Sequence, residues 1–405
     1  MIPARQPPTR DSGALGWLRV NLFSSVANSV LTVAVGALLL WSLFSLLSWV
    51  FFGASWERVW INLRLFSVYR YPVDLLWRPM AVLGLIMSLF GVTAGAASRG
   101  EGRILVSAFR WIAGLVFGLT LIALISWESV RFLWLGVSVV SVLSYLWGRA
   151  QPQLIRYMAW AWATGFIVGF GLLYGVPFVR SGPLHVVPAR EWGGFLLTLI
   201  LFTGIIPSFP LGILLALGRR SKLPAIKYFC IGFIEIVRGA PLIMWLFIAS
   251  LLLPLLLNTD PTALPALLRA YVAITLFSAA YMAENVRGGL QAVPKGQSEA
   301  ARALGLSGWQ TTRMIVLPQA LRAVIPAIVG QAIGLFKDTS LVFIVGLLDF
   351  FNVANTVANQ PQSLQVAGGI RLELSLFLAL VYWFFAYRMS VASRQLEKQL
   401  GVGVR

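Results

Sequence analysis

Few side chains in this sequence could carry out acid–base or metal chemistry. There is one histidine, His185, one cysteine, Cys230, and 14 acidic residues spread along the chain. General acid–base catalysis and metal binding both need such side chains in clusters, and a lone cysteine forms no intramolecular disulfide. We interpret His185, in a loop punctuated by Pro and Gly, as a surface residue. We therefore expect no catalytic residue, no metal ligand and no intramembrane enzyme.

Charged side chains do interrupt one apolar segment. Lys337 and Asp338 lie well inside the apolar stretch 322–346, followed by Thr339 and Ser340. Charges inside a membrane span are costly and usually functional, so these four residues could line the path of a polar substrate. The alternative is that the two charges neutralise each other and brace neighbouring helices. Both readings stay open at this point.

Two further pairs of opposite charges have the three-residue spacing that places side chains on one helix face. They are Glu235 with Arg238, and Glu284 with Arg287. The first pair precedes a break at Gly239 and Pro241, inside a stretch, 228–257, that exceeds the roughly 20 residues of one crossing. We interpret this part as an interfacial or re-entrant elbow near a cytoplasmic gate, and both pairs as structural salt bridges.

The composition indicates which class of protein positions these residues. The chain of 405 residues is 59% hydrophobic and only 11% charged, with a mean hydropathy of +0.82. Ordinary soluble domains carry about 25% charged residues. The formal net charge of +18 could indicate nucleic-acid binding, but the basic residues are scattered between apolar stretches. In a membrane protein that scatter sets topology. The chain is therefore predicted to be a polytopic membrane protein that binds no nucleic acid.

Ten membrane spans are predicted at about 20 apolar residues per crossing. They lie near 28–52, 80–98, 104–126, 132–148, 157–176, 193–218, 240–257, 267–284, 322–346 and 372–390. The first apolar run is longer than the roughly 7–15 residues of a signal-peptide core, so we expect it to be retained as a span. An even number of spans places both termini on the same side.

The distribution of arginine and lysine predicts that this side is the cytoplasm. With the N-terminus inside, most basic residues fall in cytoplasmic segments, whereas outer loops such as 347–370 carry none. The segment 54–79 is the exception, because it has four arginines and is predicted to lie outside. It is also rich in Trp and Tyr, so we interpret it as an interfacial segment whose arginines contact headgroups.

The polar, Pro-containing linker 177–192 divides the chain into two sets of five spans. We predict an N-terminal membrane extension over 1–192, a transmembrane core over 193–395 and a cytoplasmic tail over 396–405. The motifs of the core do not recur in the extension. A secondary transporter, which would be built from two related halves with broken spans, is therefore the less favoured alternative.

The segment "SEAARALGLSGWQTTRMIVLP" (298–318) predicts two short helices joined by a turn. Ser298 is a candidate N-cap that would place Glu299 in the first turn, and Gly305 is a candidate C′ residue. A capping box joins Ser307 to Gln310, and Pro318 ends the second helix or steers it into the next span. The first helix is expected to expose the small side chains of Ala300, Ala301 and Ala303. Such a segment could be a plain interfacial hairpin or a docking element.

The residue order in this segment resembles the EAA loop of ABC importer permeases. The matching residues are Glu299-Ala300-Ala301, then Gly305, then Ile315-Val316-Leu317-Pro318. The stretches "AENVRGGLQAVPKGQSEAARALGLS", "IEIVRGAPLIMWLF", "WGGFLLTLILF" and "LPQALRAVIPAIVGQAIGLFKDTSL" resemble the polar amino acid branch, which includes the histidine, glutamine and general L-amino acid permeases. The long extension is similar to the larger permease subunit of the general L-amino acid system. One departure is Ala240, where that branch often has Thr.

The resemblance implies an all-α membrane protein with a type I importer core of five spans, preceded by about five extra transmembrane helices. It implies a transporter subunit of the bacterial cytoplasmic membrane, with an EAA coupling loop over 284–318. Coupling to a separate ABC ATPase would involve the residues Glu299, Ala300, Ala301, Gly305, Leu317 and Pro318. The chain contains no G-x-x-x-x-G-K-[ST] pattern, so ATP and Mg²⁺ would be used by the ATPase dimer.

Three further expectations follow from the resemblance. The other partners would be a second permease subunit and a periplasmic solute-binding protein, and the amide-rich segment 348–369 could form an outer helix that receives the latter or a solvated loop. The substrate would be an amino acid, whose ammonium and carboxylate suit the opposite charges and hydroxyls of 337–340. The chain itself would bind no cofactor.

Overall fold

The structure is a computed structural model. It describes residues 13–98, 103–126, 130–176, 178–179, 181–256, 265–366 and 368–401. Within this part of the chain, nine helices are long and apolar enough to cross a membrane, or up to ten if one bent pair counts as a span. The predicted outer loop near 258–266 and the basic residues of the first twelve positions lie largely outside the described residues.

The N-terminal extension contains eight α-helices and four short helical turns. In chain order they are α1 (Ala14–Asn21), α2 (Val26–Ser48), η1 (Trp49–Gly53), α3 (Glu57–Ile61), α4 (Leu63–Val68), η2 (Val73–Leu75), α5 (Trp77–Ala97), α6 (Arg103–Ser126), α7 (Arg131–Ala150), η3 (Pro152–Tyr157), α8 (Met158–Tyr174) and η4 (Ala189–Glu191).

The second half begins at Gly194 and holds the remaining elements. They are α9 (Gly194–Phe202), α10 (Ile205–Gly218), α11 (Pro224–Gly239), α12 (Leu242–Phe247), η5 (Ile248–Leu252), α13 (Leu253–Leu256), α14 (Ala266–Ala292), α15 (Lys295–Ala303), α16 (Gly308–Gln310), η6 (Thr311–Val316), α17 (Leu317–Asp338), η7 (Thr339–Val345), β1 (Leu348–Asp349), α18 (Phe350–Ala358), α19 (Pro361–Leu364) and α20 (Arg371–Gln399). The strand β1 pairs in parallel with Gly193 and Gly194.

Three predicted spans are too short. The helix predicted over 267–284 continues to Ala292, so the first part of the predicted coupling loop is helical. The span predicted over 322–346 is part of one helical rod from Gly308 to Val345, and the last helix runs to Gln399 instead of 390. Hydropathy detects only the apolar part of a helix, whereas backbone hydrogen bonding carries these helices on into polar sequence.

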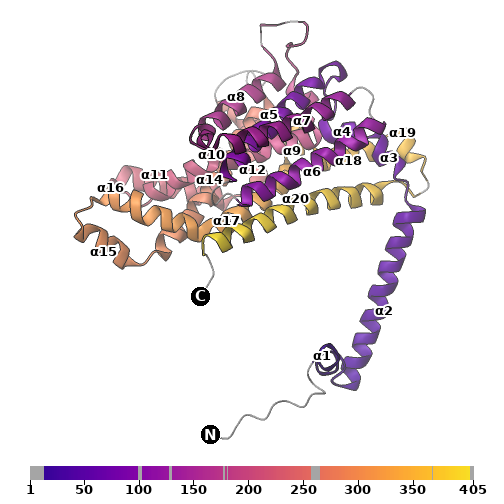
Figure 1. Cartoon of the computed structure of the whole chain (residues 1–405), viewed down its shortest axis with the longest axis horizontal. Helices are drawn as coiled ribbons and strands as arrows, with labels where there is room; N and C mark the ends of the chain where they lie inside the picture. Colours follow the sequence, from indigo (N-terminus) through magenta and orange to yellow (C-terminus); the bar gives the residue numbers. More distant parts are fainter. Residues whose placement is uncertain are drawn as a thin grey trace.

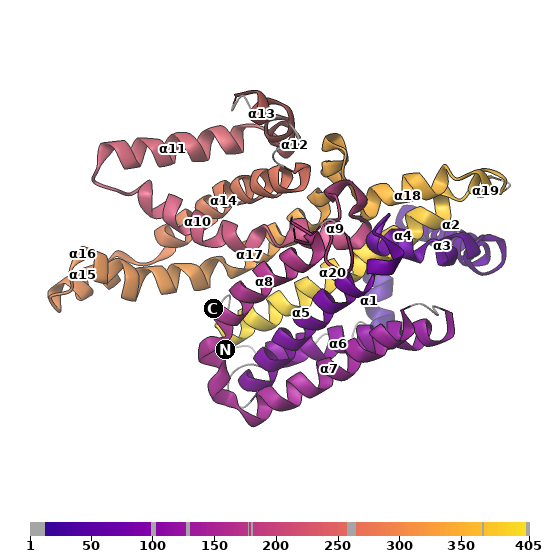
Figure 2. The same cartoon turned by 90° about the horizontal axis from the view of Figure 1, so that it is seen from above.

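The elements are arranged along one long axis. Figure 1 shows α15 and α16 at one end of the molecule, and α3, α4, α18 and α19 at the other. Figure 2 shows α5, α6 and α7 grouped on one side and α10, α11 and α14 on the other, with α20 between the groups. The last helix packs against both α17 and α6.

The two halves share a hydrophobic core. One cluster of buried side chains includes Met87 and Val137 from the extension together with Leu197, Leu246 and Ile274 from the second half. Burial of apolar side chains from both halves in one cluster stabilises their contact. The extension is therefore packed onto the core as part of the same molecule.

The helix α2 is different, because it projects from the molecule in Figure 1. No residue of α2 or η1 is buried. Ser25 caps its N-terminus by accepting from the Asn28 N–H (3.2 Å). Apolar side chains cover the helix all round, as expected for a span that faces lipid.

Candidate functional site

The short helix α15 begins earlier than the sequence indicates. Pro294 occupies the N-cap position and the helix starts at Lys295, so Ser298 is an interior residue and the prediction that it caps the helix is wrong. Proline at the boundary supplies a fixed φ that suits a helix start. Glu299 is consequently the fifth residue, outside the first turn, and its side chain is exposed.

The C-terminus of α15 has the predicted stop signal. Gly305 has a φ of +82°, the left-handed region that glycine enters without steric strain. The Gly305 N–H donates to the Arg302 carbonyl (2.9 Å) and the Leu306 N–H to the Ala301 carbonyl (3.1 Å). These two bonds form a Schellman motif, which confirms the prediction for Gly305.

The next helix starts with the predicted capping box. The Ser307 hydroxyl accepts from the Gln310 N–H (3.3 Å), and the Gln310 side chain accepts from the Ser307 N–H (2.9 Å). Both ends of the turn between α15 and α16 are therefore fixed by hydrogen bonds. The turn holds the two helices in one arrangement.

The outward surface of this pair includes both small and large apolar side chains. Ala300 and Ala303 are exposed as predicted, but Ala301 is only 2% exposed, because α15 packs against η6 on that side. Leu304 and Trp309 are 83% and 63% exposed. Large exposed apolar side chains on a projecting hairpin are typical of a surface that binds another protein.

The hairpin continues without a break into the next span. The turn η6 is a π-helix, in which the Leu317 N–H donates to the Thr312 carbonyl. Pro318 lies at the start of α17, and the helix runs past it. It does not end the helix, because the wider π-turn accommodates the missing proline N–H. The Gly308–Val345 rod thus joins the hairpin rigidly to a membrane span.

A cluster of charges lies where α10, α11 and α14 meet. Glu284 on α14 contacts Arg238 (3.3 Å) and Arg219 (3.8 Å) and also pairs with Arg287 on its own helix. Arg219 contacts Glu235 as well (2.9 Å). These four contacts join Glu284, Glu235 and three arginines. Glu284 is therefore the acidic centre of an ion-pair network that joins three helices.

The network corrects one predicted pairing. Glu284 and Arg287 form the predicted bridge, but Glu235 and Arg238 bind different partners instead of each other. Neighbouring helices offer each of them an opposite charge, and no spacing pattern along the chain indicates the role of Arg219. The elbow itself is present, since the segments 224–239 and 242–256 meet at 106°.

The residues Gly239, Ala240 and Pro241 form this sharp bend. Pro241 is the N-cap residue of α12, and the Trp245 indole N–H donates to the Val237 carbonyl (3.0 Å) across the break. A carbonyl that the broken helix leaves without an intrahelical partner is therefore satisfied. The bend is therefore stabilised by a specific hydrogen bond.

The four residues 337–340 differ in exposure. Lys337 is exposed, Asp338 and Ser340 are half-buried, and Thr339 is fully buried, its hydroxyl donating to the Phe336 carbonyl (3.0 Å). No salt bridge among the described residues joins Lys337 to Asp338. The Ser340 carbonyl accepts from the Asn352 side chain (2.7 Å).

A buried polar network at the opposite end from the hairpin was not predicted. Asp349 is fully buried and caps α18, accepting from the Asn352 N–H (3.1 Å), the Asn352 side chain (2.6 Å) and the Tyr382 hydroxyl (3.3 Å). Burial raises the pKa of this carboxyl above its usual value, while the hydrogen bonds oppose the rise. The Asp-x-x-Asn spacing before an apolar helix was the available signal for the cap.

No group of three or more His, Cys, Asp or Glu side chains that could hold a metal ion occurs among the described residues. The arrangement instead combines a projecting hairpin, an ion-pair network beside it and a bent span.

Comparison with known proteins identifies the family. Residues 208–402 match the sequence model described as "Binding-protein-dependent transport system inner membrane component". The inner membrane amino-acid ABC transporter permease YhdY of Escherichia coli (strain K12) is 38% identical over 419 residues, which cover 99% of this chain and 97% of YhdY. BztC of Rhodobacter capsulatus, a glutamate/glutamine/aspartate/asparagine transport system permease, is 35% identical over 99% of this chain and 96% of BztC.

A shorter relative matches only part of the chain. The glutamate/aspartate import permease GltK of Escherichia coli O157:H7 is 35% identical, with 53% of this chain covering 96% of GltK. The full-length similarity to YhdY and BztC includes the extension, whereas GltK has no counterpart to about half of the chain. The chain belongs to the amino-acid ABC transporter permeases, the multi-pass inner-membrane components of binding-protein-dependent transport systems.

Proposed function

We propose that this chain is the transmembrane subunit of an ATP-driven importer that moves polar or broad-range L-amino acids across the cytoplasmic membrane. Coupling to a separate ATPase would occur through the hairpin formed by α15 and α16. The observation that carries the proposal is the rigid, exposed hairpin that continues directly into the rod Gly308–Val345.

The hairpin has the mechanical properties that coupling requires. Hydrogen bonds at Gly305 and Ser307 fix its turn, and exposed Leu304 and Trp309 offer apolar surface to a partner. Displacement of a rigid element shifts the helices fused to it. Glu299 and Ala300 lie on the exposed part of α15, where Glu299 would form a polar contact with the ATPase.

The family description supports the remaining partners. An ABC ATPase dimer would bind ATP and Mg²⁺, a second permease subunit would complete the pathway, and a periplasmic solute-binding protein would deliver the amino acid. Since the ATPase is cytoplasmic, the hairpin end of the molecule would face the cytoplasm, with both chain termini on that side. The substrate named for BztC supports a polar amino acid as cargo.

The substrate path is proposed to pass the end of α17. Half-buried Asp338 would attract the ammonium group of an amino acid, and Lys337 would attract its carboxylate. The absence of a salt bridge between the two among the described residues is compatible with this role. Buried Thr339 would help to position this turn through the hydrogen bond from its hydroxyl to the Phe336 carbonyl.

Transport by the complete assembly tests the function. The chain, tagged in its own host, is purified with the ATPase and second permease and reconstituted into vesicles with the solute-binding protein. We expect uptake of labelled glutamine or glutamate only with ATP on the ATPase side. Uptake that persists without ATP and follows an ion gradient would contradict the proposal and favour a secondary transporter.

A further inference from the structure

We propose that the segment 54–70 of the N-terminal extension forms, together with α18 and α19, a docking surface for the solute-binding protein. Arg64 and Arg70 would be its charged contacts, and the partner surface would be acidic. The inference rests on the proposed function, and it assigns a role to part of the extension that short permeases such as GltK lack.

The segment is attached to the outer end of the core by specific contacts. The Ser55 N–H donates to the buried carboxylate of Glu373 (3.0 Å), and the Gln360 side chain donates to Asn62 (3.0 Å). These residues are about 300 positions apart in the sequence. The contacts fix α3 and α4 beside α18 and the start of α20, at the end of the molecule away from the hairpin (Figure 1).

Aromatic packing strengthens the attachment. The ring of Phe66, which is 1% exposed, lies 5.1 Å from the ring of Phe377 and 5.8 Å from the ring of Phe350. Edge-to-face aromatic pairs at these distances add to the stabilisation from burial. The surface of α4 is therefore held against that of α18 by packing of buried rings.

The core accommodates the segment through two glycines. A Cβ atom on Gly193 would lie 2.6 Å from the Tyr69 Cβ, and one on Gly194 would lie 2.4 Å from the Phe66 carbonyl oxygen. Gly194 also has a φ of +61°. Tyr69 itself has a φ of +57°, a rare conformation for a residue with a side chain. The first residues of the core are thus shaped to receive 66–69.

The arginines of the segment need an explanation, because basic residues are normally depleted from outer segments. Arg78, the fourth arginine of 54–79, has a structural one, since its side chain is fully buried and donates to the carbonyls of Pro183 (2.7 Å) and His185 (2.8 Å). The prediction that the arginines of this segment contact lipid headgroups is therefore wrong for Arg78. Arg64 and Arg70 are exposed and belong to none of the four ion pairs among the described residues. Their positive charge is free to face a partner.

The surroundings of these arginines have the character of a protein-binding surface. Arg70 lies over the Tyr69 ring (5.3 Å) and lines, with Arg190 and Glu191, an open hollow of about 520 Å³. Trp60 and Ile61 on α3 are 56% and 63% exposed. Arg and Trp at the surface are enriched among residues that dominate binding energy.

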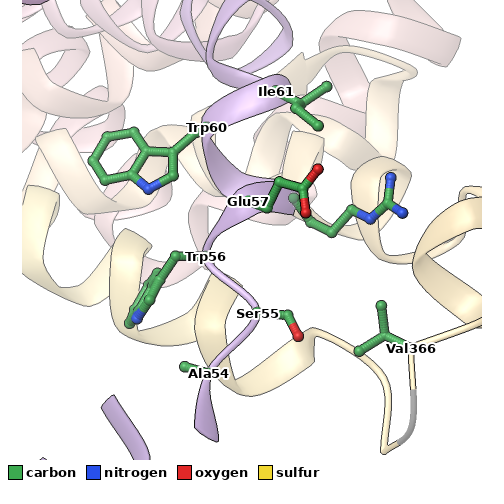
Figure 3. A pocket seen from close by; sticks show the side chains of 8 residues that line it. Ala54, Ser55, Trp56, Glu57, Trp60, Ile61 and Val366 are labelled. Carbon is green, nitrogen blue, oxygen red and sulfur yellow. The ribbon is translucent and has the colours of Figure 1, made fainter. Parts of the chain in front are cut away.

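A second hollow connects the segment to the outer loop of the core. It has a volume of about 600 Å³ and is lined by residues around α3 and by Val366 from the loop after α19. Figure 3 shows Trp56 and Trp60 on one side of the α3 segment, and Glu57 and Val366 on the other. A protein that covered the outer loop would therefore also cover α3.

One observation favours a protein over lipid as the occupant, and a second indicates the charge of that protein's surface. The segment is continuous with α18 and α19, which belong to the region 208–402 that matches a family defined by its binding-protein partner. The excess of positive charge on the segment also favours an acidic surface, because electrostatic complementarity raises the association rate and selects the partner.

Stimulation of ATP hydrolysis by the solute-binding protein tests the surface. The complete transporter is placed in nanodiscs of zwitterionic lipid, and the hydrolysis rate is measured against the concentration of the amino-acid-loaded binding protein from the same host. The variant is Arg64→Gln with Arg70→Gln. The matched control is Arg149→Gln with Arg156→Gln, which also removes two exposed arginines, one of them over its neighbouring tyrosine.

We expect the half-saturating concentration of binding protein to rise about threefold to tenfold in the variant, the range for the loss of two exposed charge pairs. The maximal rate should stay unchanged, the difference should shrink at high salt, and the control should match wild type. Equal half-saturation in variant and wild type, or a shift seen only with anionic lipid, would overturn the proposal. A wild-type transporter that the binding protein does not stimulate would instead contradict the proposed function.

Discussion

At the scale of single residues, Glu284 has a special position because three arginines from three segments lie around it. Arg219 follows α10, Arg238 lies in the last turn of α11, and Arg287 lies one turn after Glu284 on α14. Only about a quarter of the Glu284 side chain is exposed. Removing its charge would leave the arginines to repel one another in a partly desolvated place. Glu284 is therefore expected to hold the bent span against the helix that leads into the hairpin.

Replacing Glu284 with glutamine tests this role. We expect the free energy of unfolding of Glu284→Gln to fall by about 1–2 kcal/mol. This is smaller than the loss for a fully buried ion pair, because the Glu284 side chain is partly exposed to solvent. SDS titration of the purified protein measures the change. Glu235→Gln is the control, because Glu235 contacts only Arg219 within the network and is mostly exposed. Equal losses in the two variants would contradict a central role for Glu284.

Asp349 predicts a dependence of stability on pH. Burial raises the pKa of its carboxyl above the ordinary value of 3.8. The folded protein therefore binds this proton more tightly than the unfolded chain does. The stability from this group is full below about pH 3.9 and is lost as the pH rises through the folded pKa. Asp349→Asn removes the titrating group, and we expect its melting temperature to vary less with pH than that of wild type. Melting curves from pH 4 to 8 check this, and identical slopes would refute it.

At the scale of elements, the sequence predicted the apolar parts of the spans and the turn between α15 and α16. Gly305 and the pair of Ser307 and Gln310 were readable because caps depend on local residue type. Helix ends in polar sequence could not be predicted from residue type. The N-cap of α15 was placed four residues too late, at Ser298 instead of Pro294, because both residues are boundary signals. The partners of Arg238 and Asp349 depend on contacts between distant segments, which spacing along the chain does not reveal.

The junction between the extension and the core gives a prediction at this scale. Gly194→Ala would force a Cβ atom into the Phe66 carbonyl oxygen and a residue with a side chain into a positive φ. We expect the free energy of unfolding to fall by about 2–4 kcal/mol, from backbone strain and overpacking together. Gly330→Ala, in α17 where a Cβ meets nothing within 4 Å, is the control and should be neutral or slightly stabilising. Equal stability of the two variants would contradict the close fit.

At the scale of the whole molecule, the extension and the core form one body with a hairpin at one end and a composite surface at the other. Buried side chains of both halves share a core, and α3 and α4 pack against α18. The division near residue 192 was predicted from the linker, but the sequence offered no signal that residues 54–70 would reach the last helix. Such contacts arise only when the spans are assembled.

Co-purification with the ATPase tests the central claim most directly. Gly305→Asp is compared with Gly308→Asp: both place the same charge in the same hairpin, but only Gly305 has a positive φ, and Asp is acceptable at the first residue of a helix. We predict that wild type and Gly308→Asp retain the ABC ATPase in mild detergent and that Gly305→Asp loses it while still folding and inserting. Retention of the ATPase by all three proteins, or its loss from both variants, would contradict coupling through the geometry of this turn.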